Sequence, residues 1–351
     1  MRKVPVGGAL ALVLGGAFLC VWLTRIPSNV AYVTEEDGGL SVIDLSRLVV
    51  VKHVHPSDVA PRGLGLTFDG RYLVTANKDS ADMTVFDVRG LRLNLIRRIP
   101  LGDNPEFIKM FPTGRWLFTS FEPGSSGGPP GEEQEEEENE KPSEIVSFSI
   151  PAWSRGTVFT AGKETEGLEF SSDGTLLIVA NEAQDNIAVF NTGTGQLVKS
   201  VNLSTYGKRP RGVKRSPAGD SYAVTMEGSG TLLLLDRDFQ VGKTAMTAAK
   251  PYGVAFDRSG KRIFVAAATA RKLQVYRADS LQLVAEAPIG QRCWHFTFTP
   301  DDSKLLLACG RSNNVYVIDA NSYQFIKVIG GFQTPWGILT YPRAFGSLGL
   351  P

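Results

Sequence analysis

Seven residues of mixed chemical type recur at one position of a repeated motif. Each stands directly before a glycine, or before the residue that replaces it, at the start of an apolar stretch. They are Arg62, Glu106, Glu166, Arg211, Tyr252, Trp294 and Trp336. Arginine is a rigid donor for carboxylates, and tyrosine and tryptophan offer flat faces to rings or cations. If the fold gathers them, the charged half and the aromatic half together suit a small amphipathic ligand or a loop of a partner protein. The alternative is that Arg and Glu pair with each other and only pack the repeats.

His295 replaces the glycine of its own repeat and directly follows Trp294. Among the histidines it is the one placed for proton transfer or axial ligation. A histidine with no nucleophile or acid paired to it is more often structural. The sequence also has no C-x-x-C-H, G-x-S-x-G or H-E-x-x-H motif and no phosphate-binding glycine loop. These absences favour a binding protein over an enzyme.

A second set of carboxylates follows the second β-rich stretch of several repeats. Its members are Glu35, Glu122, Glu182 and Glu227. Ca²⁺ prefers several oxygen ligands, so these residues are candidates for a metal site, although nothing in their spacing enforces coordination. We expect no cofactor.

The spacing of the repeats predicts the fold. The second residues of the seven motifs are Gly63, Phe107, Gly167, Gly212, Gly253, His295 and Gly337, separated by 44, 60, 45, 41, 42 and 42 residues. This is the period of a four-stranded propeller blade. The last repeat has only its first strand, and residues 30–54 supply the missing three, which leaves no open sheet edge. We predict an all-β, seven-bladed β-propeller over residues 30–342, with a tail at 343–351.

In such a propeller the innermost strands line a central channel. The seven residues that precede the repeat glycines would therefore ring the mouth of that channel. The step of 60 residues contains an insert at 124–142, which holds seven Glu and no aliphatic or aromatic side chain. We expect this insert to be a disordered loop.

Cys293 and Cys309 are 16 residues apart, the spacing at which other repeats place Pro61 with Asn77 and Thr165 with Asn181. Such pairs should face each other across a hairpin. Outside the cytoplasm we predict a disulfide between the two cysteines.

The N-terminus carries a targeting signal. Met1-Arg2-Lys3 is basic, and residues 4–23 form an uncharged run of 20 residues, long enough to span a bilayer. No small-x-small cleavage site is obvious before Ser28. We predict that residues 1–25 are an uncleaved signal anchor with the rest on the periplasmic side of the inner membrane. The alternative is a cleaved signal peptide and secretion.

The overall charge excludes one class of partner. Lys plus Arg is 37 and Asp plus Glu is 36, so the net charge is +1. This balance gives no global reason to expect nucleic acid. We expect a monomer that contacts the membrane through its N-terminal helix.

The motifs resemble the YVTN-type β-propeller repeat. Ala31-Tyr32-Val33-Thr34 nearly spells the signature, and Val179-Ala180-Asn181 fits the same consensus. The resemblance covers residues 30–342 and implies the fold without fixing a function. Residues 290–294, 310–315 and 334–337 are similar to the subset found beside quinoprotein oxidation systems. That similarity implies an exported accessory protein. Seven-bladed lactonases and haem d1 propellers share the architecture.

We therefore predict a non-catalytic propeller that binds a protein partner or small ligand at its mouth, as an accessory to a periplasmic oxidation system. One alternative is a lactonase-like hydrolase, with His295 as base and Arg62 or Arg211 stabilising an oxyanion. The other is a haem d1 or quinone cofactor-handling protein that uses His295 and the aromatic half of the mouth.

Overall fold

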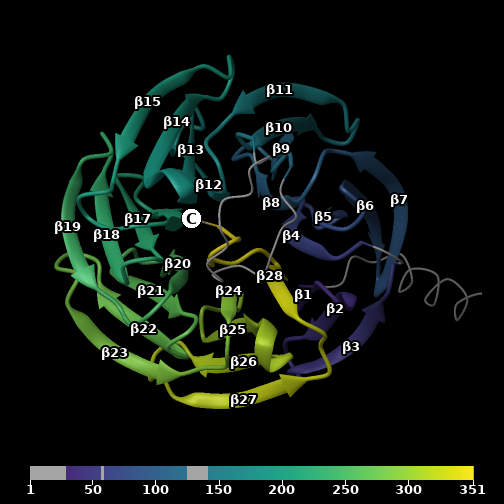
Figure 1. The fold of residues 1–351 in the computed structure, drawn as a ribbon. Helices are drawn as coiled ribbons and strands as arrows, with labels where there is room; N and C mark the ends of the chain where they lie inside the picture. The colour runs from purple at the N-terminus through teal and green to yellow at the C-terminus, as the bar shows by residue number, and fades with distance from the viewer. Residues whose placement is uncertain (1–28, 57–58, 125–140, 351) are drawn as a thin grey trace, which may run out of the picture.

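The structure, a computed structural model, describes residues 29–56, 59–124 and 141–350. In this part of the chain, seven four-stranded antiparallel sheets stand as blades around one axis (Figure 1). The prediction of an all-β, seven-bladed propeller is confirmed.

The two ends of the chain close one blade together, as predicted. From the axis outward it contains β28 (Pro335–Tyr341), β1 (Val30–Glu35), β2 (Gly39–Asp44) and β3 (Val49–Val54). The register pairs Tyr32 with Leu339 and Val30 with Tyr341. The innermost strand thus comes from the C-terminal end of the chain and the outer three from the N-terminal end.

Each of the other six blades uses four consecutive strands, innermost first. They are β4 (Pro61–Leu66), β5 (Tyr72–Asn77), β6 (Asp82–Arg89) and β7 (Arg92–Pro100); β8 (Pro105–Met110), β9 (Trp116–Phe121), β10 (Glu144–Ser149) and β11 (Arg155–Thr160); β12 (Thr165–Phe170), β13 (Leu176–Asn181), β14 (Asn186–Asn191) and β15 (Leu197–Asn202); β16 (Pro210–Arg215), β17 (Ser221–Met226), β18 (Thr231–Asp236) and β19 (Val241–Met246); β20 (Pro251–Phe256), β21 (Arg262–Ala267), β22 (Lys272–Arg277) and β23 (Leu283–Pro288); and β24 (Cys293–Phe298), β25 (Lys304–Cys309), β26 (Asn314–Asp319) and β27 (Phe325–Gly330). Two short 3₁₀ helices, η1 (Glu182–Gln184) and η2 (Gly310–Ser312), follow β13 and β25.

Burial falls from the axis to the rim. The inner strands β4, β8, β12, β20 and β24 are buried at every position, whereas outer strands such as β15 and β23 are mostly exposed. Apolar side chains fill the space between neighbouring blades. One such cluster joins Ile178 of β13 to Val213 of β16 and Val224 of β17.

The repeat glycines are explained by how closely the inner strands approach. A Cβ on Gly167, Gly212 or Gly253 would lie 2.5 Å from a carbonyl oxygen of the next inner strand. Real Cβ atoms do not come so near, and glycine is the residue that allows such an approach. The glycine of the sequence motif is therefore required by the close packing of the inner strands at the axis.

Phe107 and His295 stand where the other inner strands carry glycine, and their side chains occupy the axis. Their ring centroids are 5.7 Å apart in an edge-to-face contact. Trp336 packs against both, with its ring 5.4 Å from Phe107 and 4.4 Å from His295. The middle of the channel is filled by aromatic rings.

The C-terminal tail closes the channel at the end opposite the mouth. Gly346 pairs with Thr297 of β24, and the Ser347 amide donates to the Phe296 carbonyl at 3.0 Å. Lys214 of β16 donates to the Gly349 carbonyl at 2.8 Å. Residues 343–350 are therefore packed into the propeller.

A disulfide joins Cys293 at the start of β24 to Cys309 at the end of β25, the two residues whose spacing suggested it. The predicted anchor at 1–25 and most of the acidic insert, residues 125–140, lie outside the described residues. No helix within the described ranges is long and apolar enough to cross a membrane.

Gly253→Ala should lower the free energy of unfolding by about 1–3 kcal/mol, because the added methyl group meets the Trp294 carbonyl. Thermal and urea unfolding measure the change. Gly242→Ala on β19 is the control, since its Cβ would have one neighbour at 3.6 Å. Equal stability of the two variants would contradict this account of the motif.

Candidate functional site

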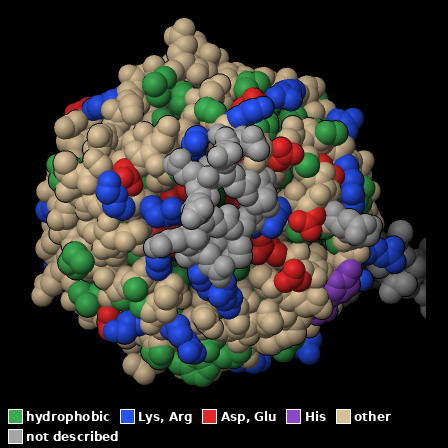
Figure 2. Space-filling view, viewed as in Figure 1, with side chains coloured by type: hydrophobic (Ala, Val, Ile, Leu, Met, Phe, Trp, Pro, Cys, Tyr) green, Lys and Arg blue, Asp and Glu red, His purple; other side chains and the backbone are tan. Residues whose placement is uncertain are grey.

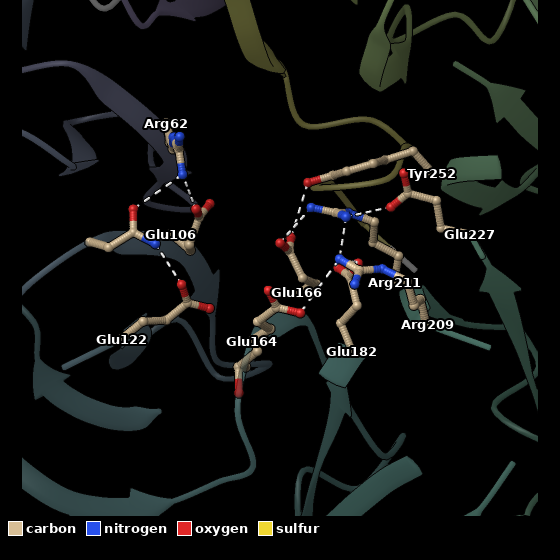
Figure 3. A network of polar contacts seen from close by, with 12 residues as sticks. Arg62, Glu106, Glu122, Glu164, Glu166, Glu182, Arg209, Arg211, Glu227 and Tyr252 are labelled. Atoms are coloured by element: carbon tan, nitrogen blue, oxygen red, sulfur yellow. Dashed lines mark hydrogen bonds and ion pairs between the residues drawn. The ribbon is translucent and has the colours of Figure 1, made fainter. Parts of the chain in front are cut away.

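Five of the seven motif residues form a polar network at the channel mouth (Figure 3). They are Arg62 on β4, Glu106 on β8, Glu166 on β12, Arg211 on β16 and Tyr252 on β20, each the second residue of its inner strand. The shared position puts all five side chains at the same height. All of them are buried. Acidic and basic side chains surround the centre of this face (Figure 2).

Arg211 is the centre of the larger half of the network. One terminal nitrogen, Nη2, lies 2.5 Å from Glu166 Oε1, and Nη1 lies 2.7 Å from Glu182 Oε2 and contacts Glu227. The guanidinium carbon is 4.5 Å from the centre of the Tyr252 ring. The Tyr252 hydroxyl in turn donates to Glu166 Oε2 at 3.1 Å. One guanidinium is thus shared by three buried carboxylates.

The outer edge of this half is less buried. Arg209 contacts Glu182, and its Nη2 is 3.5 Å from Glu164 Oε2. The side chains of Arg209 and Glu164 are 27% and 30% exposed to solvent. Solvent or a ligand arriving from the mouth face therefore meets this pair before it meets Arg211.

Arg62 is the centre of the smaller half. It forms ion pairs with Glu36 and Glu106, and its Nη1 donates to Asn104 Oδ1 at 3.2 Å. Asn104 also donates to Glu122 Oε2 at 2.5 Å. A neutral amide thus connects Arg62 to a third carboxyl group, that of Glu122.

Among the residues joined by these contacts, carboxyl groups outnumber guanidinium groups. The carboxyl groups belong to Glu36, Glu106, Glu122, Glu164, Glu166, Glu182 and Glu227, and the guanidinium groups to Arg62, Arg209 and Arg211. Burial of several negative charges in one place is costly unless some of the groups take up protons. Burial in this network therefore favours the protonated form of some of its carboxyl groups.

The directions of the pKa shifts agree with this excess. Burial raises the pKa of Glu106 to about 7, Arg62 opposes the rise, and Glu166 adds to it. Burial likewise raises the pKa of Glu166, against the opposing effect of Arg211. The pKa values of Glu122 and Glu182 are also raised, well above the usual value, with burial as the largest cause. Carboxyl groups in both protonation states are thus available at one site, as acid–base chemistry requires.

The predicted aromatic half of the mouth is not open to a ligand. Trp294 and Trp336 are buried, on β24 and β28, and Trp336 packs against Phe107 and His295. The Trp294 ring packs against Gly310, which follows β25. The tryptophans therefore stabilise the hub, and the mouth network is polar.

His295 lies deeper in the channel than the mouth network. Its Nδ1 is 3.1 Å from Ser347 Oγ, and the rings of Phe107, Tyr252 and Trp336 surround it. Burial lowers the pKa of His295 well below its usual value, so the imidazole is neutral. His295 is therefore enclosed by side chains below the mouth network. This position does not favour the axial role or a base acting at the mouth.

The four carboxylates considered for Ca²⁺ do not converge. Glu35 accepts from the Gln333 amide at 2.6 Å, Glu122 accepts from Asn104, and Glu182 and Glu227 share Arg211. Across the described ranges, no group of three or more His, Cys, Asp or Glu side chains is placed to hold a metal ion. The guanidinium groups take the place that a cation would occupy.

A second charged cluster lies deeper in the channel, and the sequence reading missed it. Glu169 Oε2 is 2.9 Å from Lys109 Nζ and 3.4 Å from Lys214 Nζ. The two lysines outweigh burial and lower the pKa of Glu169 to about 2. Each of the three residues follows a motif residue by three positions, which puts it on the same channel wall. This constant spacing of three positions is the feature of the sequence that could have predicted the cluster.

The space inside the channel is small. A cavity of about 20 Å³ lies between the mouth network and the tail, lined among others by Glu166, Tyr252, His295 and Ser347. Pockets that enclose small organic ligands measure roughly 300–1,000 Å³. A ligand of that size must therefore meet the network from the mouth face.

Two comparisons of the sequence match lactonases over part of the chain. The sequence profile of the family described as "Lactonase, 7-bladed beta-propeller" matches residues 150–255. The 6-phosphogluconolactonase of Bacillus subtilis (strain 168) is 32% identical over 101 residues, or 27% of this chain and 29% of that relative. The segment matched by the family profile contains Glu166, Glu182, Arg211 and Glu227.

Solved structures share the whole propeller. A functionally unknown protein from Desulfotomaculum acetoxidans DSM 771 superposes with a TM-score of 0.75 at 13% identity, covering 89% of this chain and 98% of the other. The periplasmic gluconolactonase of Pseudomonas aeruginosa superposes with a TM-score of 0.71 at 17% identity, covering 91% and 99%. At these identities the likeness is one of fold.

The prediction of a non-catalytic binding propeller is wrong. The matching family and the matching curated relative are lactonases, which are hydrolases. That prediction depended on the absence of local catalytic motifs from the sequence. The side chains of the mouth network come from strands far apart in the sequence, so no local motif marks them.

Arg211→Met should lower the free energy of unfolding by about 3–5 kcal/mol, because it leaves Glu166, Glu182 and Glu227 without their shared cation. Urea unfolding at pH 7 measures this loss. Arg277→Met, an exposed arginine on β22, is the matched control and should leave stability nearly unchanged. A small effect for Arg211→Met would mean that the network is solvated.

The protein should be more stable at pH 5 than at pH 8. Glu106, Glu122, Glu166 and Glu182 hold protons in the folded state at pH values where the unfolded chain has released them. The folded state then binds more protons, so stability falls as pH rises from about 4.5 through 7.

Thermal unfolding between pH 5 and 8 tests this. Glu122→Gln imitates a protonated carboxyl and should flatten the dependence, whereas Glu144→Gln, at a half-exposed site on β10, should leave it unchanged. A rise of the melting temperature toward pH 8 would contradict the assignment.

Proposed function

We propose that this protein is a hydrolase that opens the ring of a lactone at the channel mouth. The observation that carries the proposal is the sharing of Arg211 by Glu166, Glu182 and Glu227, with the Tyr252 hydroxyl on Glu166. Hydrolysis of a lactone needs a base for water, a cation for the developing oxyanion and an acid for the leaving oxygen. The network contains a group for each role.

The roles follow from charge and position. Glu166, as its carboxylate, accepts a proton from the water that attacks the carbonyl carbon. Arg211, already aimed at Glu166, stabilises the negative charge that forms on the carbonyl oxygen. Glu106 holds a proton near neutral pH because burial raises its pKa to about 7. It gives this proton to the ring oxygen as the carbon–oxygen bond breaks, and the product is a hydroxy acid.

The substrate approaches from the mouth face. The cavity below the network is far too small for a sugar-sized ring, and the tail closes the opposite end. Glu36, Glu164 and Arg209 keep partial exposure at this face, so they are the first residues a substrate meets. If the substrate displaced these side chains, the carbonyl group of the lactone would reach Arg211.

The protein works outside the cytoplasm in this proposal. A disulfide persists in oxidising compartments, and the basic N-terminus followed by the uncharged run 4–23 predicts export and anchoring in the inner membrane. Association with a quinoprotein oxidation system stays a prediction. It is chemically compatible, because oxidation of a cyclic hemiacetal gives a lactone.

The test is hydrolysis of glucono-1,5-lactone by the purified protein, followed through proton release with a pH indicator. We expect rates well above spontaneous hydrolysis. Glu166→Gln should lower kcat/KM by about 100-fold or more, because the base is lost while the shape of the side chain is kept.

Glu286→Gln is the matched control, since Glu286 pairs with Lys272 on the exposed rim and should keep full activity. Hydrolysis no faster than in buffer, for this lactone and for its 6-phosphate ester, would overturn the proposal. Equal activity of Glu166→Gln and the unmodified protein would overturn the assignment of the base.

A further inference from the structure

The side of the propeller opposite the mouth carries a patch that is both basic and apolar. We call it the Arg–Leu patch. It consists of Arg71, Arg89, Arg92, Arg97 and Arg115 together with Phe68, Leu91, Leu95, Ile96 and Trp116. All lie in the turns β4–β5, β6–β7 and β8–β9 or on the adjoining strands β6, β7 and β9. These turns join strands at the end of the blades where the inner strands finish, away from the mouth.

The patch is continuous across two neighbouring blades. The Phe68 ring lies so close to Gly114, beside Arg115, that a Cβ there would be 3.0 Å from it. Arg97 reaches across to donate to the Ala152 carbonyl of the next blade at 3.0 Å. Arg71 and Arg89 both lie against Asp87. Residues 67–71, 87–97 and 111–117 contain five arginines but only two carboxylates, Asp69 and Asp87. The patch therefore has an excess of positive charge.

Large apolar side chains are exposed in the same place. Leu91, Leu95 and Ile96 keep 42%, 47% and 48% of their surface. Other exposed apolar pairs, such as Leu283 and Val284, lie near turns with Asp279, Asp301 and Asp302 instead of an arginine excess. Apolar exposure together with arginine is the combination that suits the interface of an anionic bilayer.

The start of the described chain lies beside this patch. Val30, the first residue of β1, pairs with Tyr341, whose hydroxyl donates to the Asp69 carbonyl at 3.1 Å. Six residues, 24–29, separate Val30 from the uncharged run 4–23. A chain of that length reaches about 20 Å at most. If the run enters a bilayer, Val30 lies within that distance of the lipid headgroups, on the side of the propeller that carries the patch.

We infer that the Arg–Leu patch rests on the surface of a bilayer containing anionic phospholipid. The arginines pair with phosphate groups of the lipid while Leu91, Leu95, Ile96 and Trp116 dip between the headgroups. The opposite face, with the channel mouth, then points away from the membrane. This surface is independent of the hydrolase proposal, because it shares no residue with the mouth network.

The test uses the full-length protein reconstituted in two kinds of vesicle, pure phosphatidylcholine and a mixture with 30% phosphatidylglycerol. Hydrogen–deuterium exchange is followed in peptides covering residues 89–97 and 111–117. We expect exchange at these segments to be about fivefold slower in the anionic vesicles, since a single arginine near an anionic surface contributes about that factor. In 0.5 M NaCl the difference should disappear.

The variant Arg92→Glu with Arg115→Glu should remove the protection. Both side chains are exposed, so folding should be preserved, and an unchanged melting temperature checks this. Arg237→Glu with Lys261→Glu is the charge-matched control on turns of other blades at the same end, and it should keep the protection. Equal exchange in the two vesicles, protection that survives in the patch variant, or loss of protection in the control would overturn the inference.

Discussion

Seven inner strands meet around one axis with so little room that a methyl group does not fit between several of them. A Cβ on Gly167, Gly212 or Gly253 would press on the carbonyl oxygen of the next strand. This crowding fixes the height of every inner strand relative to its neighbours. The residue before each glycine therefore reaches the same level of the mouth, and side chains from blades far apart in the sequence come into contact.

The same constraint separates the polar part of the hub from its apolar part. Where Phe107 and His295 replace glycine, their rings take the axis itself, and Trp336 packs on both. Above them the buried arginines compensate the carboxylates that surround them. Below them Lys109 and Lys214 contact Glu169, and the Gly349 carbonyl of the tail accepts a hydrogen bond from Lys214. The hub is thus a stack of layers, and the mouth network is the layer nearest the mouth.

Burial controls the ionisation of that layer. Carboxyl groups that lie in water stay ionised at neutral pH, whereas burial raises the pKa values of Glu106, Glu122, Glu166 and Glu182. The stability of the propeller then depends on the protons that these groups bind, and the proposed hydrolysis would use the same groups.

The blade count, the closure by both ends and the height of the motif residues were all present in the sequence, because a repeat of fixed period carries its geometry with it. The cysteine spacing likewise pointed to the pair that is joined. The partners of each side chain were decided only by the tertiary structure. The repeat does not predict that Trp294 and Trp336 are buried, that His295 lies below the mouth network, or that Arg211 is shared by three carboxylates. Those outcomes depend on the space left between strands and on the competition of buried charges for few counterions, and both are properties of the assembled ring.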